Sequence, residues 1–173
     1  EETCKLLGVN GTILPVSYDK TSLVATYEDG TEVLGEHYID ASSGKLAKLR
    51  ITDLRTIPKV KIDQDTKLAI MKADVIILGP GDLYTNTIAN LAVLGVRESI
   101  ESSMAKVVFV MNLMSRAGET YGYKASDFMN DLSKYLDPTR LDYIGINVET
   151  SHSPTIKKKY ADEGSIPVED DLG

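Results

Sequence analysis

Beyond Asp63, apolar runs of strand length alternate with segments whose apolar residues recur at helical spacing, and no other feature constrains the fold more. The clearest run is Val75 to Leu78, which is uninterrupted and typical of a buried parallel strand. The pattern predicts strands over 75–78, 106–113 and 143–148, and helices over 65–72, 85–92, 97–103, 126–136 and 154–161, the first capped by Asp65. Because such alternation over short connections is typical of parallel sheets, we expect an α/β fold with a mostly parallel sheet and helices on both faces.

The preceding part of the chain, residues 12–62, has a pattern typical of antiparallel strands. Two alternating runs, 23–27 and 33–39, are separated by Glu28-Asp29-Gly30-Thr31. Asp-Gly between such runs favours a hairpin, since glycine tolerates the positive φ that tight turns require. Further strands are expected at 12–16, 46–51 and 60–62, with a break or an edge at Pro58. We therefore expect an antiparallel hairpin excursion near the N-terminus.

The length of the chain predicts a single domain. Its 173 residues, 42% of them hydrophobic, fit one compact unit made of the β-rich excursion (12–62) and an α/β part (63–173). Thr3 to Leu7 followed by Gly8 resembles the last turn of a helix, because glycine commonly follows helix ends. The sequence is therefore expected to begin within a helix of a larger fold, so that residues 1–173 form an incomplete domain.

Charge and composition exclude several classes of protein. The formal net charge of −7 opposes binding to nucleic acid, which requires Lys and Arg on one face. One Cys and two His cannot assemble a Cys/His zinc cluster within this chain, and the lone Cys4 forms no internal disulfide. No apolar stretch approaches the roughly 20 residues of a membrane span. We expect no metal ligands and no membrane span, and a cytoplasmic location.

The loop after the first predicted parallel strand is the first candidate site. Gly79-Pro80-Gly81-Asp82 turns the chain from the strand into a helix that begins near Thr85. Free backbone N–H groups at such a corner suit a phosphate, and glycine lets an anion approach the main chain. The alternative is a tight turn in which Asp82 or Thr85 caps the helix, and the pattern alone leaves both interpretations open.

The loop after the next strand, 111–123, is the second candidate site. In an open α/β sheet this polar loop lies beside the first, at the edge where ligands bind. Asn112 can contact a base or a sugar through its amide. Ser126 and Asp127 are expected only to cap the following helix, and Tyr121 and Tyr123 only to pack.

The remaining polar features carry weaker predictions. His37 and His152 lack a neighbouring nucleophile motif and are expected at the surface. Residues 157–159, three lysines, are expected on a solvated helix face, and the acidic residues 169–171 in an exposed tail. None of the motifs assigns a catalytic residue.

Several spaced motifs in one order resemble the YvcK gluconeogenesis-factor family, which belongs with the 2-phospho-L-lactate transferase (CofD) superfamily. They are Gly79-Pro80-Gly81-Asp82-Leu83-Tyr84-Thr85, Ile88, Asn90-Leu91, Gly95-Val96, Asn112-Leu113-Met114, Gly118-Glu119-Thr120, Gly122-Tyr123 and Ala125-Ser126-Asp127. The resemblance covers most of the chain. It implies a Rossmann-like fold that binds a nucleotide, in YvcK-type members a UDP-sugar, and a role in carbon metabolism, cell shape and cell-wall synthesis without an established reaction.

The resemblance also implies which residues contact the ligand. Gly79, Gly81 and Thr85 would donate to the diphosphate, and Asn112 and Met114 would contact the nucleoside or sugar. The expected ligand-binding set is Gly79, Pro80, Gly81, Asp82, Tyr84, Thr85, Asn112 and Met114. The family's first Gly-rich phosphate loop does not occur here, so the chain would carry one wall of the site.

This chain departs from the family pattern at several positions. Asp82 stands where the family usually has Ser, and a carboxylate beside a diphosphate repels it unless it points away or shares a Mg²⁺ ion with the ligand. Asp82→Ser is thus predicted to strengthen diphosphate binding, and bridging Mg²⁺ would reverse the sign. Arg116-Ala117 replaces a common Gln-Pro pair, Tyr121 an Asp, and Phe128 a His.

Three functions remain open at this point. The first is a UDP-sugar-binding regulatory protein, and the second is a CofD-type transferase that moves a phospholactyl group to a deazaflavin. The third is an interaction module without a small ligand, which the Asp82 replacement and the missing Gly-rich loop favour. An open sheet edge also favours self-association into a homo-oligomer.

Overall fold

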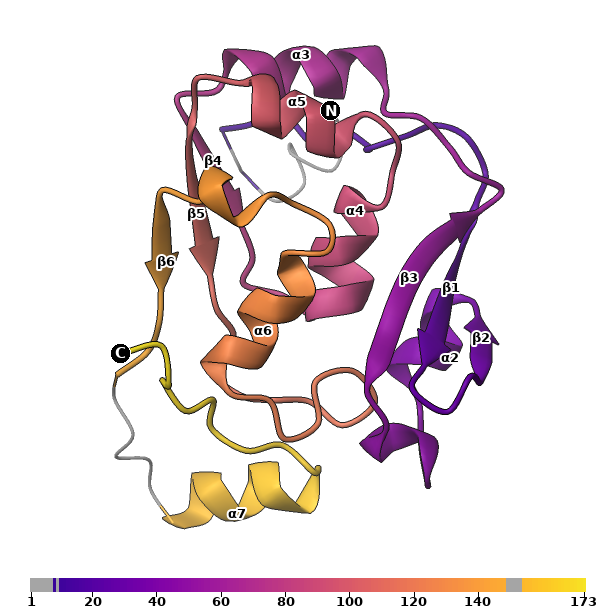
Figure 1. The fold of residues 1–173 in the computed structure, drawn as a ribbon, viewed down its shortest axis with the longest axis vertical. Coiled ribbons are helices and arrows are strands. Elements are labelled where there is room, and N and C mark those ends of the chain that lie inside the picture. Colours follow the sequence, from indigo (N-terminus) through magenta and orange to yellow (C-terminus); the bar gives the residue numbers. More distant parts are fainter. Residues whose placement is uncertain (1–7, 9, 149–153) are drawn as a thin grey trace.

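The computed structural model describes residue 8 and residues 10–148 and 154–173 (Figure 1). The elements, in chain order, are β1 (Ser22–Tyr27), β2 (Glu32–Leu34), α2 (Glu36–Asp40), the 3-10 helix η1 (Leu46–Lys48), β3 (Ile51–Ile57), α3 (Gln64–Lys72), β4 (Val75–Leu78), the π-helix η2 (Leu83–Ile88), α4 (Ala89–Leu91), α5 (Val96–Ser102), β5 (Lys106–Val110), α6 (Ala125–Leu132), the 3-10 helix η3 (Pro138–Arg140), β6 (Tyr143–Gly145) and α7 (Pro154–Asp162). The helix end expected at 3–7 and the surface position expected for His152 lie outside the described residues.

The described chain forms a parallel sheet and a separate antiparallel sheet, so the predicted α/β class is confirmed. Strands β4, β5 and β6 are hydrogen-bonded in that order, all parallel. Strands β2, β1 and β3 form the antiparallel sheet. In Figure 1, α4 lies between the two sheets, and α3 and α5 lie together at one end of the molecule. The loops that leave β4 and β5 therefore run toward the antiparallel sheet.

The parallel strands bury only one of their two faces. Val107 and Phe109 of β5 are fully buried, whereas Val75 and Ile77 of β4 are 52% and 63% exposed. The register pairs Val75 with Lys106 and Ile77 with Val108, which places these residues on one face of the sheet. The run 75–78 is thus a parallel strand as predicted, but the expectation of complete burial is wrong for this face.

The predicted hairpin is confirmed: β1 and β2 pair in antiparallel orientation, and β2 is shorter than predicted. Gly30, with a φ of 83°, donates its N–H to the Tyr27 carbonyl at 2.9 Å. Strand β2 ends at Leu34 because Gly35, with a φ of 100°, turns the chain into α2. The prediction of a strand over 33–39 is therefore wrong beyond residue 34.

Other boundaries also differ from the sequence predictions. Residues 12–16 form no strand, 46–48 form η1 in place of a strand, and 60–62 make only an isolated bridge at Lys61 to Leu94. The N-cap of α3 is Asp63, whose carboxylate accepts the N–H of Asp65 at 2.8 Å. Because the helix begins at Gln64, directly after Asp63, Asp65 lies within its first turn and is not the N-cap.

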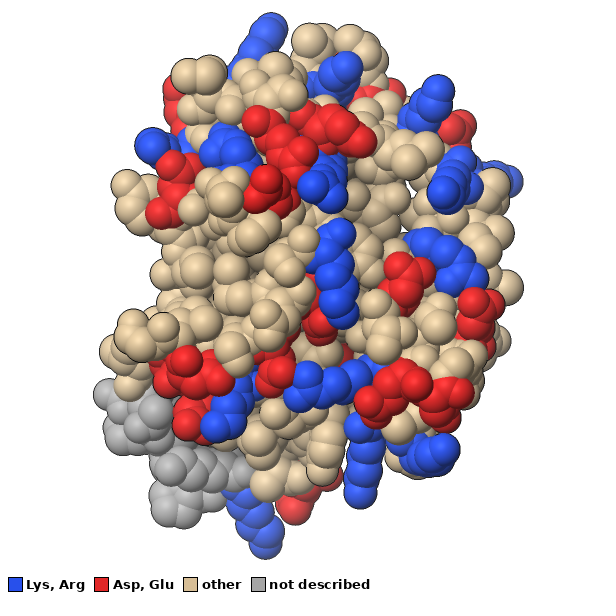
Figure 2. Space-filling model, in the orientation of Figure 1, with Lys and Arg blue, Asp and Glu red and all other residues tan. Residues whose placement is uncertain are grey.

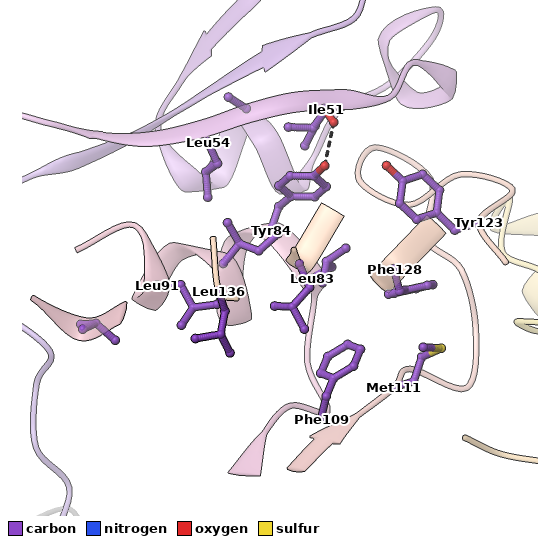
Figure 3. Packing of buried hydrophobic residues seen from close by; sticks show 14 of the residues in the cluster. Ile51, Leu54, Leu83, Tyr84, Leu91, Phe109, Met111, Tyr123, Phe128 and Leu136 are labelled. Carbon is purple, nitrogen blue, oxygen red and sulfur yellow. Dashed lines mark hydrogen bonds between the residues drawn. The ribbon is translucent and has the colours of Figure 1, made fainter. Parts of the chain in front are cut away.

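One hydrophobic core connects both sheets (Figure 3). The ring of Tyr84 lies between Ile51 and Leu54 of β3 on one side and Leu83 on the other. Its hydroxyl is 2.7 Å from the Ile51 carbonyl oxygen and 2.7 Å from Oδ2 of the buried Asp131. The core thereby fixes the start of η2, directly after the first candidate loop, against the antiparallel sheet.

On the face seen in Figure 2, Lys and Arg alternate with Asp and Glu and form no continuous basic stripe. Among the described residues, no helix combines the length and the apolar character needed to cross a membrane.

Candidate functional site

The first candidate loop is shaped by the close approach of two strands. Gly79 has a φ of 78°, and a Cβ built on it would lie 2.6 Å from the carbonyl oxygen of Val110 in β5. An L-residue is therefore excluded twice, by its backbone conformation and by the neighbouring strand. At Gly81 a Cβ would lie 3.3 Å from Cβ of Asn86. The structure explains Gly79 by strand packing, without reference to a ligand.

The helix that follows this loop is capped by a residue from the second loop. Asp82 occupies the N-cap position of η2, but its side chain makes no capping hydrogen bond. Glu119 instead accepts the N–H of Tyr84 at 2.9 Å, the N–H of Thr85 at 3.4 Å and the Thr85 hydroxyl at 2.6 Å. The anion at this helix N-terminus is thus a carboxylate of the same chain. Asp82 is the N-cap residue, as one of the two alternatives predicted, but the capping hydrogen bonds are accepted by Glu119.

Burial controls the ionisation of both carboxyl groups at this corner. Glu119 is 1% exposed, and burial raises its pKa although hydrogen bonds from Thr85 and Tyr84 act in the opposite direction. Burial also raises the pKa of Asp82, against the lowering effect of Arg116. Desolvation therefore outweighs the local partners in both cases.

Arg116 joins three parts of the molecule through ion pairs. Its Nη1 contacts Asp82 in the first loop, and its Nη2 lies 2.7 Å from Oδ1 of Asp40 at the end of α2. The two family departures noted at positions 82 and 116 are therefore partners of each other. An Asp82 carboxylate paired with a guanidinium does not act on a ligand as an isolated charge.

Three carboxylates meet at this point. One oxygen each from Asp40, Asp82 and Glu119 lie within 4.8 Å of one another. Oxygen donors of this kind suit Mg²⁺ or Ca²⁺. In the structure, two of the three carboxylates, those of Asp40 and Asp82, form ion pairs with the Arg116 guanidinium.

The two candidate loops meet at one cavity of about 380 Å³. It is lined by Pro80, Asp82, Asn112, Leu113, Met114, Ser115, Arg116, Tyr160, Glu163 and Ser165. Four of the expected ligand-binding residues are thus brought together, namely Pro80, Asp82, Asn112 and Met114. The half-buried Asn112 makes no side-chain hydrogen bond to any residue in the described part of the chain. Its amide remains available to a ligand.

The other expected residues lie elsewhere. Gly79, Pro80 and Gly81 border a second cavity of about 400 Å³, lined mainly by aliphatic side chains such as Leu14, Ile76 and Val96. Tyr84 and Thr85 line neither of these two cavities, because Tyr84 is in the core and Thr85 is bonded to Glu119. The loop 79–81 is therefore a wall between two cavities of different polarity.

The chain after α7 completes the polar cavity, which the sequence patterns did not predict. Ser115 donates its N–H to the Ile166 carbonyl at 2.7 Å, and Met114 pairs with Pro167 in an antiparallel bridge. Asp171, expected in an exposed tail, accepts the N–H and the hydroxyl of Ser126 at 2.8 and 2.7 Å. The end of the described chain is thus docked along the second loop.

Two kinds of residue were missed by sequence reasoning. The sequence patterns give Glu119 no role of its own, although a carboxylate between Gly118 and Gly122, in the loop that follows a predicted strand, is a signal that could have identified it. Tyr160, Glu163 and Ser165 line the cavity from α7 and the segment after it. No spacing in the sequence connects them to residues 80 or 112.

Comparisons with known proteins identify the family to which this chain is similar. The sequence model of the family described as "2-phospho-L-lactate transferase CofD" matches residues 1–173. A "Putative gluconeogenesis factor" of Thermotoga maritima is 40% identical over 168 residues, which are 96% of this chain and 51% of the relative. A "Gluconeogenesis factor" of Halalkalibacterium halodurans is 39% identical over 167 residues, 96% of this chain and 50% of the relative.

The fold is shared with a solved structure. A crystallised Bacillus halodurans protein described as a member of the upf0052 family superposes with a TM-score of 0.88 at 38% identity. The match covers 98% of this chain and 54% of that protein. The chain spans about half the length of the curated relatives it matches. By its sequence and its fold, the chain belongs to the CofD family and, within it, to the gluconeogenesis factors of the YvcK type.

Proposed function

We propose that this chain supplies one wall of a nucleotide-sugar site in a YvcK-type regulatory protein, with a UDP-sugar as the ligand. One observation carries the proposal: the loops after β4 and β5 converge on one polar cavity, where the Asn112 amide has no protein partner among the described residues. A cavity of about 380 Å³ is of the size that small-molecule ligands occupy. The cellular role is then the coupling of carbon metabolism to cell shape and cell-wall synthesis in the cytoplasm.

The lining of the polar cavity indicates which residues would contact the sugar or the base of such a ligand. Asn112 and Glu163 line the cavity and have groups that bind sugar or base hydrogen-bonding edges. The N–H groups of Tyr84 and Thr85 already donate to Glu119, so they are not assigned to the diphosphate. This assignment differs from the expectation that Thr85 contacts phosphate.

Isothermal titration calorimetry with UDP-N-acetylglucosamine on the full-length gene product tests the proposal. We expect binding, and we expect Asn112→Ala to weaken it about tenfold, the equivalent of one lost hydrogen bond of about 1.4 kcal/mol. Asn130→Ala, which removes an exposed amide from α6, is the matched control and should bind like the wild type. No heat at millimolar ligand would contradict the proposal.

A CofD-type transferase is the second candidate, favoured by the match of the transferase family model to the whole chain. It predicts turnover of a guanosine diphosphate phospholactate donor with a deazaflavin acceptor. Absence of turnover together with retained UDP-sugar binding would exclude the transferase and leave the first proposal standing.

A further inference from the structure

Of the described residues that line the polar cavity, only Arg116 carries a positive charge. The other charged side chains of that lining, Asp82 and Glu163, are acidic. An anion that enters the cavity would therefore be repelled by two carboxylates unless Arg116 contacts it directly. The side chain of Arg116 is 39% exposed, which leaves it accessible from the cavity.

The guanidinium retains unused hydrogen-bond donors. An arginine side chain has five N–H groups, arranged as a planar fork that matches phosphate oxygens in pairs. In the structure Nη1 contacts Asp82 and Nη2 contacts Asp40, so each carboxylate engages a different nitrogen. Neither carboxylate therefore forms a bidentate pair with the guanidinium. A diphosphate could therefore bind Arg116 while Asp40 still holds the other nitrogen.

The backbone N–H groups at the start of η2 are not free to bind an anion in place of Arg116. The N–H groups of Tyr84 and Thr85, the usual donors at a helix N-terminus, are taken by the buried Glu119. An anion would have to displace a carboxylate with three hydrogen bonds to reach them. An anion that displaces the Asp82 carboxylate from Arg116, which is more exposed than Glu119, breaks only one ion pair.

We propose that Arg116 is the residue that binds the diphosphate of the ligand, that Asp40 positions its guanidinium, and that Asp82 competes with the diphosphate for it. The inference rests on the proposed function for the identity of the anion. It makes Asp82 a specificity-determining residue: the carboxylate admits only ligands whose anionic group binds Arg116 more strongly than Asp82 does.

The main test compares four proteins, the wild type, D82N, R116Q and D82N/R116Q, each in the full-length gene product. Each is titrated with inorganic pyrophosphate in the presence of chelator, and the titration is repeated with Mg²⁺. We expect D82N to bind about tenfold more tightly than the wild type, and R116Q at least tenfold more weakly. The decisive comparison is R116Q in the D82N background, where the binding gained by D82N should be lost. Thermal unfolding of each variant identifies any that fail to fold, and R116K, which keeps the charge without the fork, should bind with intermediate affinity.

Each other outcome has one meaning. Equal affinity of D82N and D82N/R116Q would overturn the inference, because Arg116 would then only neutralise Asp82. Absence of pyrophosphate binding in all four proteins would also overturn it. A loss of binding in D82N that appears only with Mg²⁺ would overturn it in favour of a cation held by the carboxylates.

UDP-N-acetylglucosamine titrations of the same four proteins separate this inference from the proposed function. If pyrophosphate shows the expected pattern and the UDP-sugar does not bind, the role of Arg116 stands and the proposed ligand is wrong. If the UDP-sugar binds all four proteins equally, the proposed function stands and the role of Arg116 is wrong.

Discussion

Removal of the Glu119 side chain should destabilise the protein more than removal of any other carboxylate at the site. Glu119 is 1% exposed and accepts three hydrogen bonds, from the Tyr84 N–H, the Thr85 N–H and the Thr85 hydroxyl. Glu119→Ala would leave these donors buried without an acceptor and would create a small cavity. The start of η2, and with it the loop 79–82, would lose its cap.

The magnitude follows from the donors that lose their partner. A buried donor without a partner costs about 1–3 kcal/mol, and two of the three hydrogen bonds are short enough to count fully. We expect a loss of about 3–5 kcal/mol, the range in which buried polar networks fall when they are broken. For a chain of this length that is a decrease in Tm of about 6–20 °C.

Glu119→Gln is the matched control. The amide oxygen can accept the two N–H groups, and the amide nitrogen can donate to the Thr85 hydroxyl, so we expect a loss of about 1 kcal/mol or less at pH 7. The variant also isolates the ionisation of Glu119. Because burial raises the pKa of Glu119 in the folded state, this side chain binds more protons in the folded protein than in the unfolded chain as pH rises past its ordinary pKa of 4.5. The contribution of Glu119 is therefore complete below that pH and is lost as pH rises through the folded pKa.

Urea unfolding of the wild type, E119A and E119Q between pH 4 and pH 8 measures these effects. E119A should be the least stable throughout, and E119Q should gain stability relative to the wild type as pH rises. A free energy of unfolding for E119A within about 1 kcal/mol of the wild type would refute the assignment of Glu119 as the cap of η2.

Three further substitutions test the structure at two glycines and in the core. Gly79→Ala should cost about 2–4 kcal/mol, because its Cβ would lie 2.6 Å from the Val110 oxygen at a φ of 78°. Gly30→Ala, at a φ of 83° with no atom within 4 Å of the built Cβ, should cost only about 1 kcal/mol, and equal losses in urea unfolding would contradict the packing argument. Tyr84→Phe should cost about 1–2 kcal/mol, since the hydroxyl 2.7 Å from Asp131 is lost in the core, and unchanged unfolding would show that this hydroxyl does not contribute.

Local patterns predicted the elements that depend on local forces. Strand β4 has the predicted bounds because an apolar run between Asp74 and Gly79 leaves no other choice of ends. The hairpin at Gly30 was predictable for the same reason, since its turn requires a positive φ. Where the chain turned at Gly35, the alternating pattern of 33–39 continued past the turn and gave the wrong element.

The site was only partly predictable because its decisive contacts join distant residues. Convergence of Pro80 and Asn112 follows from the rule that the carboxyl ends of parallel strands share one edge. The pairing of Asp82 with Arg116, and the capping of η2 by Glu119, span more than thirty residues and have no local signal. The predicted repulsion between Asp82 and a diphosphate was derived for an isolated carboxylate, and the guanidinium beside it changes that premise.

A crystal structure of the full-length gene product with UDP-N-acetylglucosamine tests the central claim most directly. We predict that the ligand lies in the cavity between Pro80, Asn112 and Met114, with its diphosphate on Arg116. A bound ligand that contacts none of these four residues would contradict the account.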